Sequence, residues 1–379
     1  YIDGLINLLE TVDNKENIHV DLFFNSTNSH KIGVGGDDQG NENYFDGYMA
    51  EINFIDGSQL TPASFAETDA KTGQWNPKKY AGSYGTNGFY LNFSDNSGTS
   101  ATTLGKDSSG NGNNYTPNNF SVSAGVGNDS LEDTPTNNFS TLNPRTRFGT
   151  TTPSLSNGNL NFNLSNNDMY PHSTFLIPKS GKWYAEVVFT AVGSGAVVGV
   201  QNPALFDNNG SSGTHRHNGI TYVGTDIRVD DSSVQSSLTN LGVNNIIGIC
   251  VDRDAGTVLF KNNNSNVGNA QALSASAGST EDLNFTAGRN SSGGSNVIGY
   301  FNFGQRPFSY TPPTGFLTLD SANLPDPTIL LPNKYFDTLL WSGNSTNNRS
   351  ITGLEFKPDW VWIKARTVSI MSHYLVYSL

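Results

Sequence analysis

The chain has 379 residues, of which 14% are charged, 35% hydrophobic and 11% aromatic, and it contains 40 Gly and 16 Pro. It is too aromatic and too patterned for a disordered chain, and too rich in turn formers for a helical protein. The net charge of −12 disfavours nucleic acid and anionic membrane surfaces as partners, because both are negatively charged, whereas a divalent cation would be attracted. We therefore expect an all-β protein of short strands and many turns.

Two further features limit the class of protein. Cys250 is the one cysteine, so no internal disulfide can form, and its place in the apolar run 246–251 predicts a buried side chain. The sequence shows no signal peptide and no apolar run of membrane-spanning length, so we expect no membrane insertion. The chain opens on Tyr1 rather than Met and stops just after an apolar run, and we expect both ends to be cuts in a longer polypeptide.

Residues 1–114 are predicted to form a first β domain. A short amphipathic helix is expected at 2–10, and strands at 18–24, 31–34, 47–55 and 88–93. The stretch 47–55 alternates in the manner of a strand with one wet face, and Asp56-Gly57 ends it in a tight turn. A helical turn is expected after Thr61-Pro62, because Pro suits the first helical position.

Residues 115–154 are polar, and we expect an inter-domain linker pinned by Phe120, Leu131 and Phe139. Residues 155–324 are predicted to form a second β-sandwich, with strands at 160–164, 174–177, 183–192, 196–200, 220–223, 227–229, 246–251, 257–261, 283–286 and 297–303. The runs 183–192 and 196–200, joined by a Gly-Ser-Gly turn, form the most obvious hairpin. A second hairpin turns at 252–256.

Residues 325–379 are predicted to form a Pro-rich, extended exit from the sandwich and the start of a C-terminal β domain. Strands are expected at 335–342 and 356–365.

Phrases in the first domain resemble a known sandwich. The block HKIGVGGDDQGNENYFDGYMAEINFIDG, which begins at His30, resembles the closing strands of a laminin-G/concanavalin-like jelly roll. GFYLNF at 88–93, followed by DSSGNGNN at 107–114, is similar to how such domains open. Their reversed order implies that the N-terminal half of the sandwich lies before Tyr1, or that the two blocks pair with each other.

Residues 44–139 resemble a recurrent arrangement in structural proteins of tailed phages, especially marine phages. The phrases that carry the resemblance include YFDGYMAEINFIDG, YGTNGFYLNFSDNS and GKDSSGNGNNYTPNNFSVSAG. The phrase that starts at Tyr335, YFDTLLWSGNSTNNRSITGLEFKPDWVWIKAR, resembles the opening of the C-terminal domain in the same phage proteins. The resemblance implies a virion protein.

The second domain resembles the SPRY/B30.2 sandwich from end to end. The phrases are GKWYAE at 181–186, IIGICVDRDAGTVLF at 246–260 and YFNFG at 300–304, in the order and roughly the spacing of that family. The resemblance implies binding of protein partners through loops at one end of the sandwich. The loops themselves do not match, so no ligand residue is carried over.

The acidic loop of the first domain is the candidate metal site. Asp37, Asp38, Glu42 and Asp46 could supply the hard oxygens that calcium prefers, and laminin-G-like sandwiches often carry calcium at a loop edge. A solvated acidic turn explains the same residues and is favoured, because loop composition fixes little geometry. No other cofactor is expected.

Aromatic residues near loops are the candidate sugar-binding residues. Trp75, Tyr80 and Tyr84 are proposed to stack on glycan rings, and Tyr115, Trp341 and Trp360 are further loop aromatics. Several of these residues must belong to cores instead, because a sandwich needs large side chains inside.

We therefore expect a non-enzymatic virion protein built of tandem antiparallel β-sandwiches, a laminin-G/concanavalin-like jelly roll and then a SPRY-like sandwich. Its place would be a tail fibre, an appendage or the capsid surface, and its partners other virion proteins and copies of itself. The alternative is an adhesin that binds a host-surface glycan, with or without calcium. A polysaccharide-degrading tailspike ranks last, because it needs a carboxylate pair, and the sequence pairs none of Glu51, Glu186 and Asp282.

Overall fold

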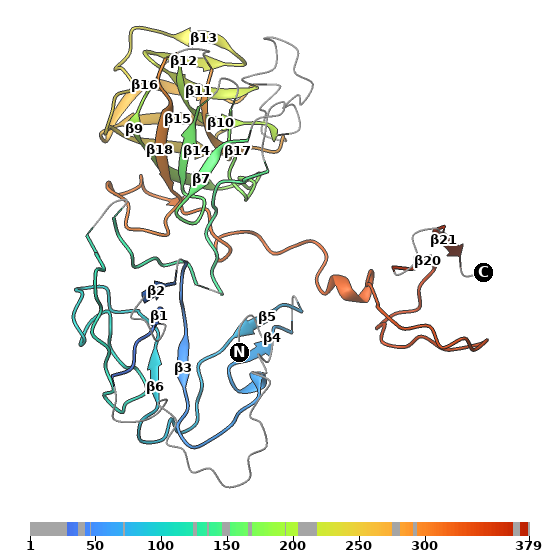
Figure 1. Ribbon diagram of the computed structural model, residues 1–379. Coiled ribbons are helices and arrows are strands. Elements are labelled where there is room, and N and C mark those ends of the chain that lie inside the picture. The colour runs from blue at the N-terminus through green and yellow to red at the C-terminus, as the bar shows by residue number, and fades with distance from the viewer. Residues whose placement is uncertain are drawn as a thin grey trace. The chain divides into compact units, whose positions relative to one another are not determined.

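The computed structural model describes residues 29–36, 42–45, 47–70, 73–123, 127–134, 136–145, 152–165, 169–193, 195–203, 218–274, 281–290, 294–366 and 372–377. Apart from the short 3-10 helices η1 (Pro62–Ser64) and η3 (Pro332–Lys334), the regular elements of this part are β-strands. They pair antiparallel with one exception, so the all-β class is confirmed (Figure 1). Contacts divide the chain into two units. One contains Leu60–Ala81 and Asp326–Leu379. The other contains Glu10–Gln59 and Gly82–Pro325.

In the larger unit, the first part of the chain forms two small sheets. β1 (Val34–Gly36) pairs with β2 (Glu42–Tyr44), and β3 (Ile52–Phe54) pairs with β6 (Phe89–Leu91). Residues 52–54 of the first block and 89–91 of the second therefore pair with each other, which is one of the two arrangements that their order left open. The predicted strand 47–55 is shortened to β3, because Glu51 has a φ of 55° and breaks the extended backbone directly before it.

The smaller unit holds two hairpins. β4 (Ala66–Thr68) pairs with β5 (Trp75–Pro77), and β20 (Trp360–Ile363) pairs with β21 (Tyr374–Tyr377). The helical turn expected after Thr61-Pro62 is confirmed as η1. The strand expected at 335–342 is wrong: this stretch is irregular, and its large apolar side chains are exposed, as in Tyr335 and Leu340.

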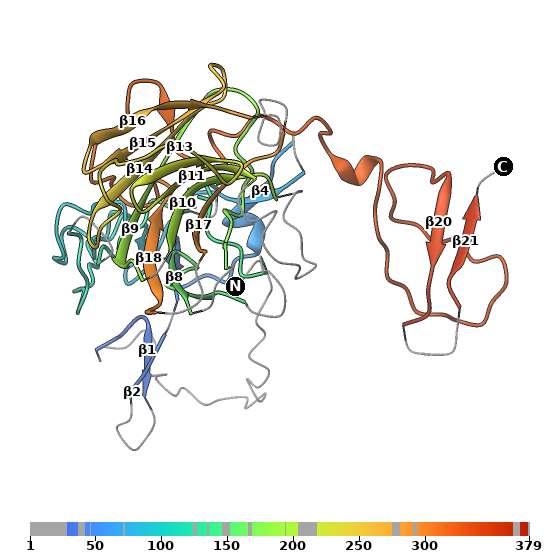
Figure 2. The same cartoon turned by 90° about the horizontal axis from the view of Figure 1, so that it is seen from above.

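The rest of the larger unit is a sandwich of two sheets (Figures 1 and 2). The five-stranded sheet runs β13 (Ser232–Gln235), β12 (Asp226–Val229), β11 (Gly219–Val223), β10 (Ala196–Gln201), β17 (Asn284–Arg289). The eight-stranded sheet runs β16 (Ser265–Ala272), β15 (Thr257–Asn262), β14 (Ile246–Asp252), β9 (Lys182–Ala191), β18 (Val297–Asn302), β8 (Asn161–Leu164), β7 (Ser154–Ser156), with β19 (Phe316–Leu317) parallel to β9.

The predicted hairpin between 183–192 and 196–200 is wrong, although both strands exist. β9 pairs with β14 and β18, whereas β10 pairs with β11 and β17, so the two strands belong to opposite sheets. The turn between them is a corner from one sheet to the other. Gly193 has a φ of 46° there, and a Cβ on it would lie 2.3 Å from the carbonyl oxygen of Ser295. The hairpin predicted around 252–256 is confirmed as β14–β15.

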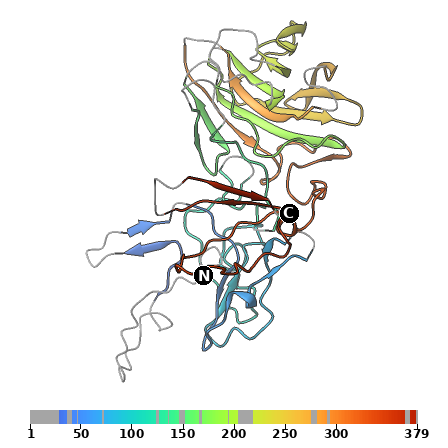
Figure 3. The same ribbon diagram turned by 90° about the vertical axis from the view of Figure 1, so that its right-hand side faces the viewer.

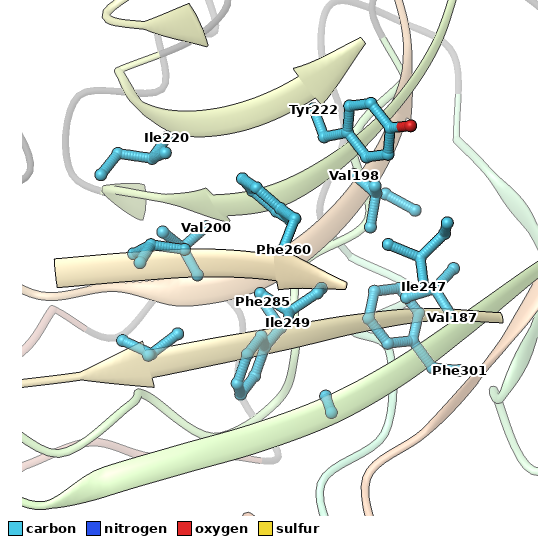
Figure 4. Packing of buried hydrophobic residues seen from close by; sticks show 14 of the residues in the cluster. Val187, Val198, Val200, Ile220, Tyr222, Ile247, Ile249, Phe260, Phe285 and Phe301 are labelled. Atoms are coloured by element: carbon cyan, nitrogen blue, oxygen red, sulfur yellow. The ribbon is translucent and has the colours of Figure 1, made fainter. Parts of the chain in front are cut away.

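The core lies between the two sheets (Figure 4). The five-stranded sheet contributes Val198, Val200, Ile220, Tyr222 and Phe285, and the eight-stranded sheet contributes Val187, Ile247, Ile249, Phe260 and Phe301. These side chains are fully buried, at an exposure of 0%. The alternating positions of each strand supply them, as the period of a strand requires.

The outer face of β9 is also covered. Tyr184 makes an edge-on contact with Phe308 at 4.9 Å between ring centroids. Glu186 accepts hydrogen bonds from the backbone N–H groups of Ser309 (2.8 Å) and Tyr310 (3.0 Å). The segment that leaves β18 therefore folds back over the strand and is fixed to it by a buried carboxylate.

Residues in the range expected as a linker join the sandwich. Phe139 forms an isolated bridge with Asp320, and the backbone N–H of Leu142 donates to the carbonyl of Asn159. The strand expected at 174–177 is wrong: within this stretch only Ile177 forms a bridge, to Leu283.

We predict that Phe301→Ala destabilises the sandwich by about 3–5 kcal/mol, because it empties a packed site. The ring of Phe301 stacks on that of Phe303, with 4.9 Å between centroids, and is fully buried. Hydrogen exchange of β9 and β18 measures the loss. Val234→Ala, at a side chain that is 46% exposed, is the matched control and should change the free energy by less than about 0.5 kcal/mol. Equal protection in the two variants would contradict the assigned core.

Candidate binding surfaces

The predicted calcium site lies almost entirely outside the described residues. Asp37, Asp38 and Asp46 are not described, and of Glu42 the structure gives only the backbone, which pairs with Gly36 between β1 and β2. The calcium site therefore stays a prediction. Among the residues that are described, no group of three or more His, Cys, Asp or Glu side chains is placed to hold a metal ion.

The three predicted glycan-stacking residues differ in exposure. Trp75, in β5, is 46% exposed. Tyr80 is partly buried and packs on Phe65, with 5.3 Å between ring centroids. Tyr84 is 6% exposed, and its hydroxyl donates to Asn53 Oδ1 at 2.9 Å. Burial leaves no face of the Tyr84 ring for a sugar, so this residue is part of a core, and Trp75 is the exposed member of the set.

The DSSGNGNN phrase is built around one carboxylate. Asp107 is 5% exposed and accepts hydrogen bonds from the backbone N–H groups of Tyr90 (2.8 Å), Ser109 (2.8 Å) and Asn113 (2.9 Å), and from the Ser109 hydroxyl (2.8 Å). Burial raises the pKa of Asp107, but these hydrogen bonds outweigh it and hold the pKa below its usual value. The carboxylate oxygens are thus used to close the loop rather than to bind a ligand.

The amides of the same loop hold the strand beside it. Asn111 Nδ2 donates to the carbonyls of Gly85 (2.7 Å) and Gly88 (2.8 Å), and Asn113 Nδ2 donates to that of Gly88 at 3.0 Å. A Cβ on Gly88 would lie 1.8 Å from the carbonyl oxygen of Tyr84, so the position requires glycine. The phrase that resembles the start of a laminin-G-like domain is therefore a structural clamp.

The three acids weighed for glycoside hydrolysis each have a separate partner. Glu51 accepts a hydrogen bond from the Tyr90 hydroxyl, and Glu186 from the Tyr184 hydroxyl at 3.1 Å. Asp282 forms an ion pair with Lys179 at 3.3 Å. They lie on or beside strands of three different sheets.

The β20–β21 hairpin, the dark red pair of strands in Figure 3, exposes large apolar side chains that sequence reasoning did not identify as a surface. Its register places Trp360 opposite Tyr377 and Trp362 opposite Leu375, so these four side chains share one face. They are 43%, 71%, 59% and 56% exposed, respectively. We call them the tryptophan face of the hairpin. The alternation in WVWI was the available signal, but it predicts a strand without saying whether its face is covered.

The tryptophan face is ordered by its own contacts. The indole N–H of Trp362 donates to Nδ1 of His373 at 2.7 Å, and the Trp360 and Trp362 rings lie 6.3 Å apart between centroids. The hydrogen bond requires a tautomer of His373 in which Nδ1 carries no hydrogen. The large side chains are therefore held in position for a contact rather than left to rotate freely.

Comparisons with known proteins give limited information. The sequence model of a family described as a domain of unknown function (DUF7483) matches residues 331–378, well under half of the chain. A search of the curated proteins found no match. Among solved structures, the SPRY domain of human HERC1 is similar, with 13% identity and a TM-score of 0.30, over 39% of this chain and 91% of that domain. No helix in the described ranges reaches the length and apolarity that a membrane crossing needs.

A TM-score of 0.30 does not support a shared fold, so the resemblance to SPRY domains rests on the sequence phrases. The structure places those phrases on adjacent strands of one sheet: β9, the β14–β15 hairpin, and the end of β18. The β-sandwich that they form is the part of the prediction that is confirmed.

We predict that the β3–β6 sheet loses protection against hydrogen exchange as the pH falls below about 4, through the depressed pKa of Asp107. A carboxyl whose folded pKa is lowered contributes stability above its unfolded pKa and loses it as it becomes protonated. Asp107→Asn, which is isosteric, should lower protection at pH 7 and remove this pH dependence. Glu132→Gln, at an exposed position, is the control. An unchanged profile in Asp107→Asn would contradict the assigned role.

Proposed function

We propose that this chain is a non-enzymatic structural protein of a tailed-phage virion, placed in a tail fibre, an appendage or the capsid surface. It would mediate assembly and contact with the host surface. The specific phrases over residues 44–139 and from Tyr335 onward support the phage assignment by resemblance. The first part of the chain is interpreted as a laminin-G/concanavalin-like segment, and the sandwich as a SPRY-like domain.

The tryptophan face of the hairpin is the observation that carries the assembly role. An isolated two-stranded sheet is marginally stable in water, and its unpaired edges and apolar side chains are templates for contact with another chain. Trp is also among the residues most enriched at energetically important positions of interfaces. Two exposed Trp residues on one face therefore favour a hairpin that is covered by further protein, and we propose that a neighbouring molecule supplies it.

The proposed mechanism combines a rigid scaffold with repeated contacts. The sandwich buries its core completely, so it would provide a rigid support for the loops that join its strands. Copies joined through the hairpin would bind a surface with several loops at once, and the effective concentration would multiply a weak single affinity.

The second candidate is an adhesin that recognises a host-surface glycan. The half-exposed ring of Trp75 favours it, since an exposed aromatic face is what a sugar ring packs against. This candidate is compatible with the first, because one virion protein can both assemble and bind.

We predict that the purified 379-residue chain self-associates and that Leu375→Lys weakens the association by about tenfold or more. The substitution places a charge on the tryptophan face, where burying it would be costly. Tyr374→Lys is the matched control: Tyr374 is 60% exposed and adjacent in β21, but its side chain is on the opposite face. Sedimentation equilibrium measures both.

Two results would contradict this assembly role. One is a chain that remains monomeric at the highest soluble concentration. The other is an association that Leu375→Lys and Tyr374→Lys weaken equally.

A further inference from the structure

The loop between Trp341 and Ile351 curves around an open, solvent-facing hollow of about 420 Å³, and every residue that lines it is exposed. The volume lies within the range of small-ligand sites in proteins, which is about 300–1,000 Å³. Its walls come from one continuous stretch of chain, in which Asn344, Asn347 and Asn348 supply amides and Trp341 an aromatic ring. The hollow is thus polar on most sides and aromatic on one.

Local contacts hold the loop in a curled shape. Nη1 of Arg349 donates to the carbonyl of Ser342 and closes a ring of the chain. Within the ring, Asn344 Oδ1 accepts hydrogen bonds from the backbone N–H (3.2 Å) and the hydroxyl (2.7 Å) of Thr346. Ser345 and Asn348 have φ angles of 59° and 57°, which residues other than glycine adopt at a cost. The shape is therefore specified by the sequence.

The chemistry of the walls selects the ligand class. Trp341 is 46% exposed and offers a flat apolar face of the kind on which a pyranose ring packs. The amides around it can both donate and accept hydrogen bonds, which matches the hydroxyls of a sugar. Arg349 is the one charged residue of the lining, and a guanidinium pairs best with a planar carboxylate.

We propose that this hollow binds an acidic oligosaccharide, with a pyranose ring on Trp341 and its carboxylate at Arg349. The proposal rests on the carbohydrate-binding candidate of the previous section and gives it a location. It moves the glycan contact away from Tyr84, which is buried, to an aromatic residue that has amides and a cation beside it.

An acidic sugar fits the hollow better than an apolar ligand or a phosphate would. Apolar ligands need predominantly apolar walls, whereas here Trp341 and Ile351 are the two large apolar residues of the lining. A phosphate site is built from converging backbone N–H groups and several cations, and this lining offers a single Arg. A neutral sugar could accept hydrogen bonds from the guanidinium but would not pair with its charge.

The test measures binding to the full 379-residue chain by isothermal titration calorimetry, with a galacturonate trisaccharide and its methyl-esterified form as probes. The two probes share ring shape and differ in charge. We expect saturable binding of the acid and about tenfold weaker binding of the ester. Trp341→Ala should weaken both by about tenfold, and Phe336→Ala, at an exposed aromatic residue outside the hollow, should change neither.

Two further variants separate the contributions of shape and charge. Gly343 lines the hollow, and a Cβ on it would meet nothing within 4 Å, so Gly343→Ala should be silent while Gly343→Leu fills the space and blocks both probes. Arg349→Gln should remove the preference for the acid over the ester, and it should also weaken both probes, because it breaks the bond to Ser342 that closes the loop.

The proposal is overturned if the acid shows no saturable binding at millimolar concentration, or if Trp341→Ala or Gly343→Leu binds it as tightly as the unmodified chain. The assembly role is judged separately by sedimentation of the same samples. Association that is intact without sugar binding removes this site alone, and sugar binding by a chain that remains monomeric removes the assembly role alone.

Discussion

Strand β9 is buried on both faces, and the rest of the sandwich is arranged around the need to cover it. Its core face packs against the five-stranded sheet, and its outer face carries Tyr184 and Glu186. Burial raises the pKa of Glu186, although the N–H groups of Ser309 and Tyr310 lower it. A buried carboxylate without partners would cost several kcal/mol, so the chain after β18 must return to this strand. The same return brings β19 alongside β9.

Most of the sandwich strands could be predicted from the sequence because they are apolar runs. The polar strands at the sheet edges could not be predicted. β13 and β16 lie at sheet edges and consist mainly of Ser, Gln, Asn, Gly and Ala, so they carry no apolar period. The hairpin error at 183–200 has a related cause. A strand buried on both faces has no alternation, and its sequence does not say whether the next strand pairs with it or crosses to the other sheet.

The roles of the candidate site residues depend on contacts with residues elsewhere in the chain, and local sequence patterns do not predict such contacts. Tyr84 reads as a loop aromatic, but its burial follows from the hydroxyl bond to Asn53 and the stacking on Tyr90. Asp107 sits in a run of turn formers, and its role is set by donors up to 17 residues away. Trp341 was recognised as a loop aromatic, but the ring that Arg349 closes around the hollow is a property of the folded loop.

Two kinds of region differ in how their large apolar side chains are buried. The sandwich buries them, whereas the C-terminal region leaves many of them exposed. The sandwich buries its apolar side chains in one core, and the clamp pairs the Asp107 carboxylate with backbone and hydroxyl donors, so these parts provide rigidity. Residues 329–377, in contrast, carry more than half of the large hydrophobic side chains that are exposed in the described part of the chain. A β-sandwich supports enzymes, adhesins and shell proteins alike, and the function therefore depends on those surfaces rather than on the fold.

The most direct measurement is a cryo-EM reconstruction of an intact particle that contains this chain, at a resolution that places β20–β21. The account predicts that the tryptophan face is covered by another copy of the chain or another virion protein, and that the sandwich loops point outward. A hairpin whose tryptophan face stays in solvent, or sandwich loops that are buried between subunits, would contradict the account.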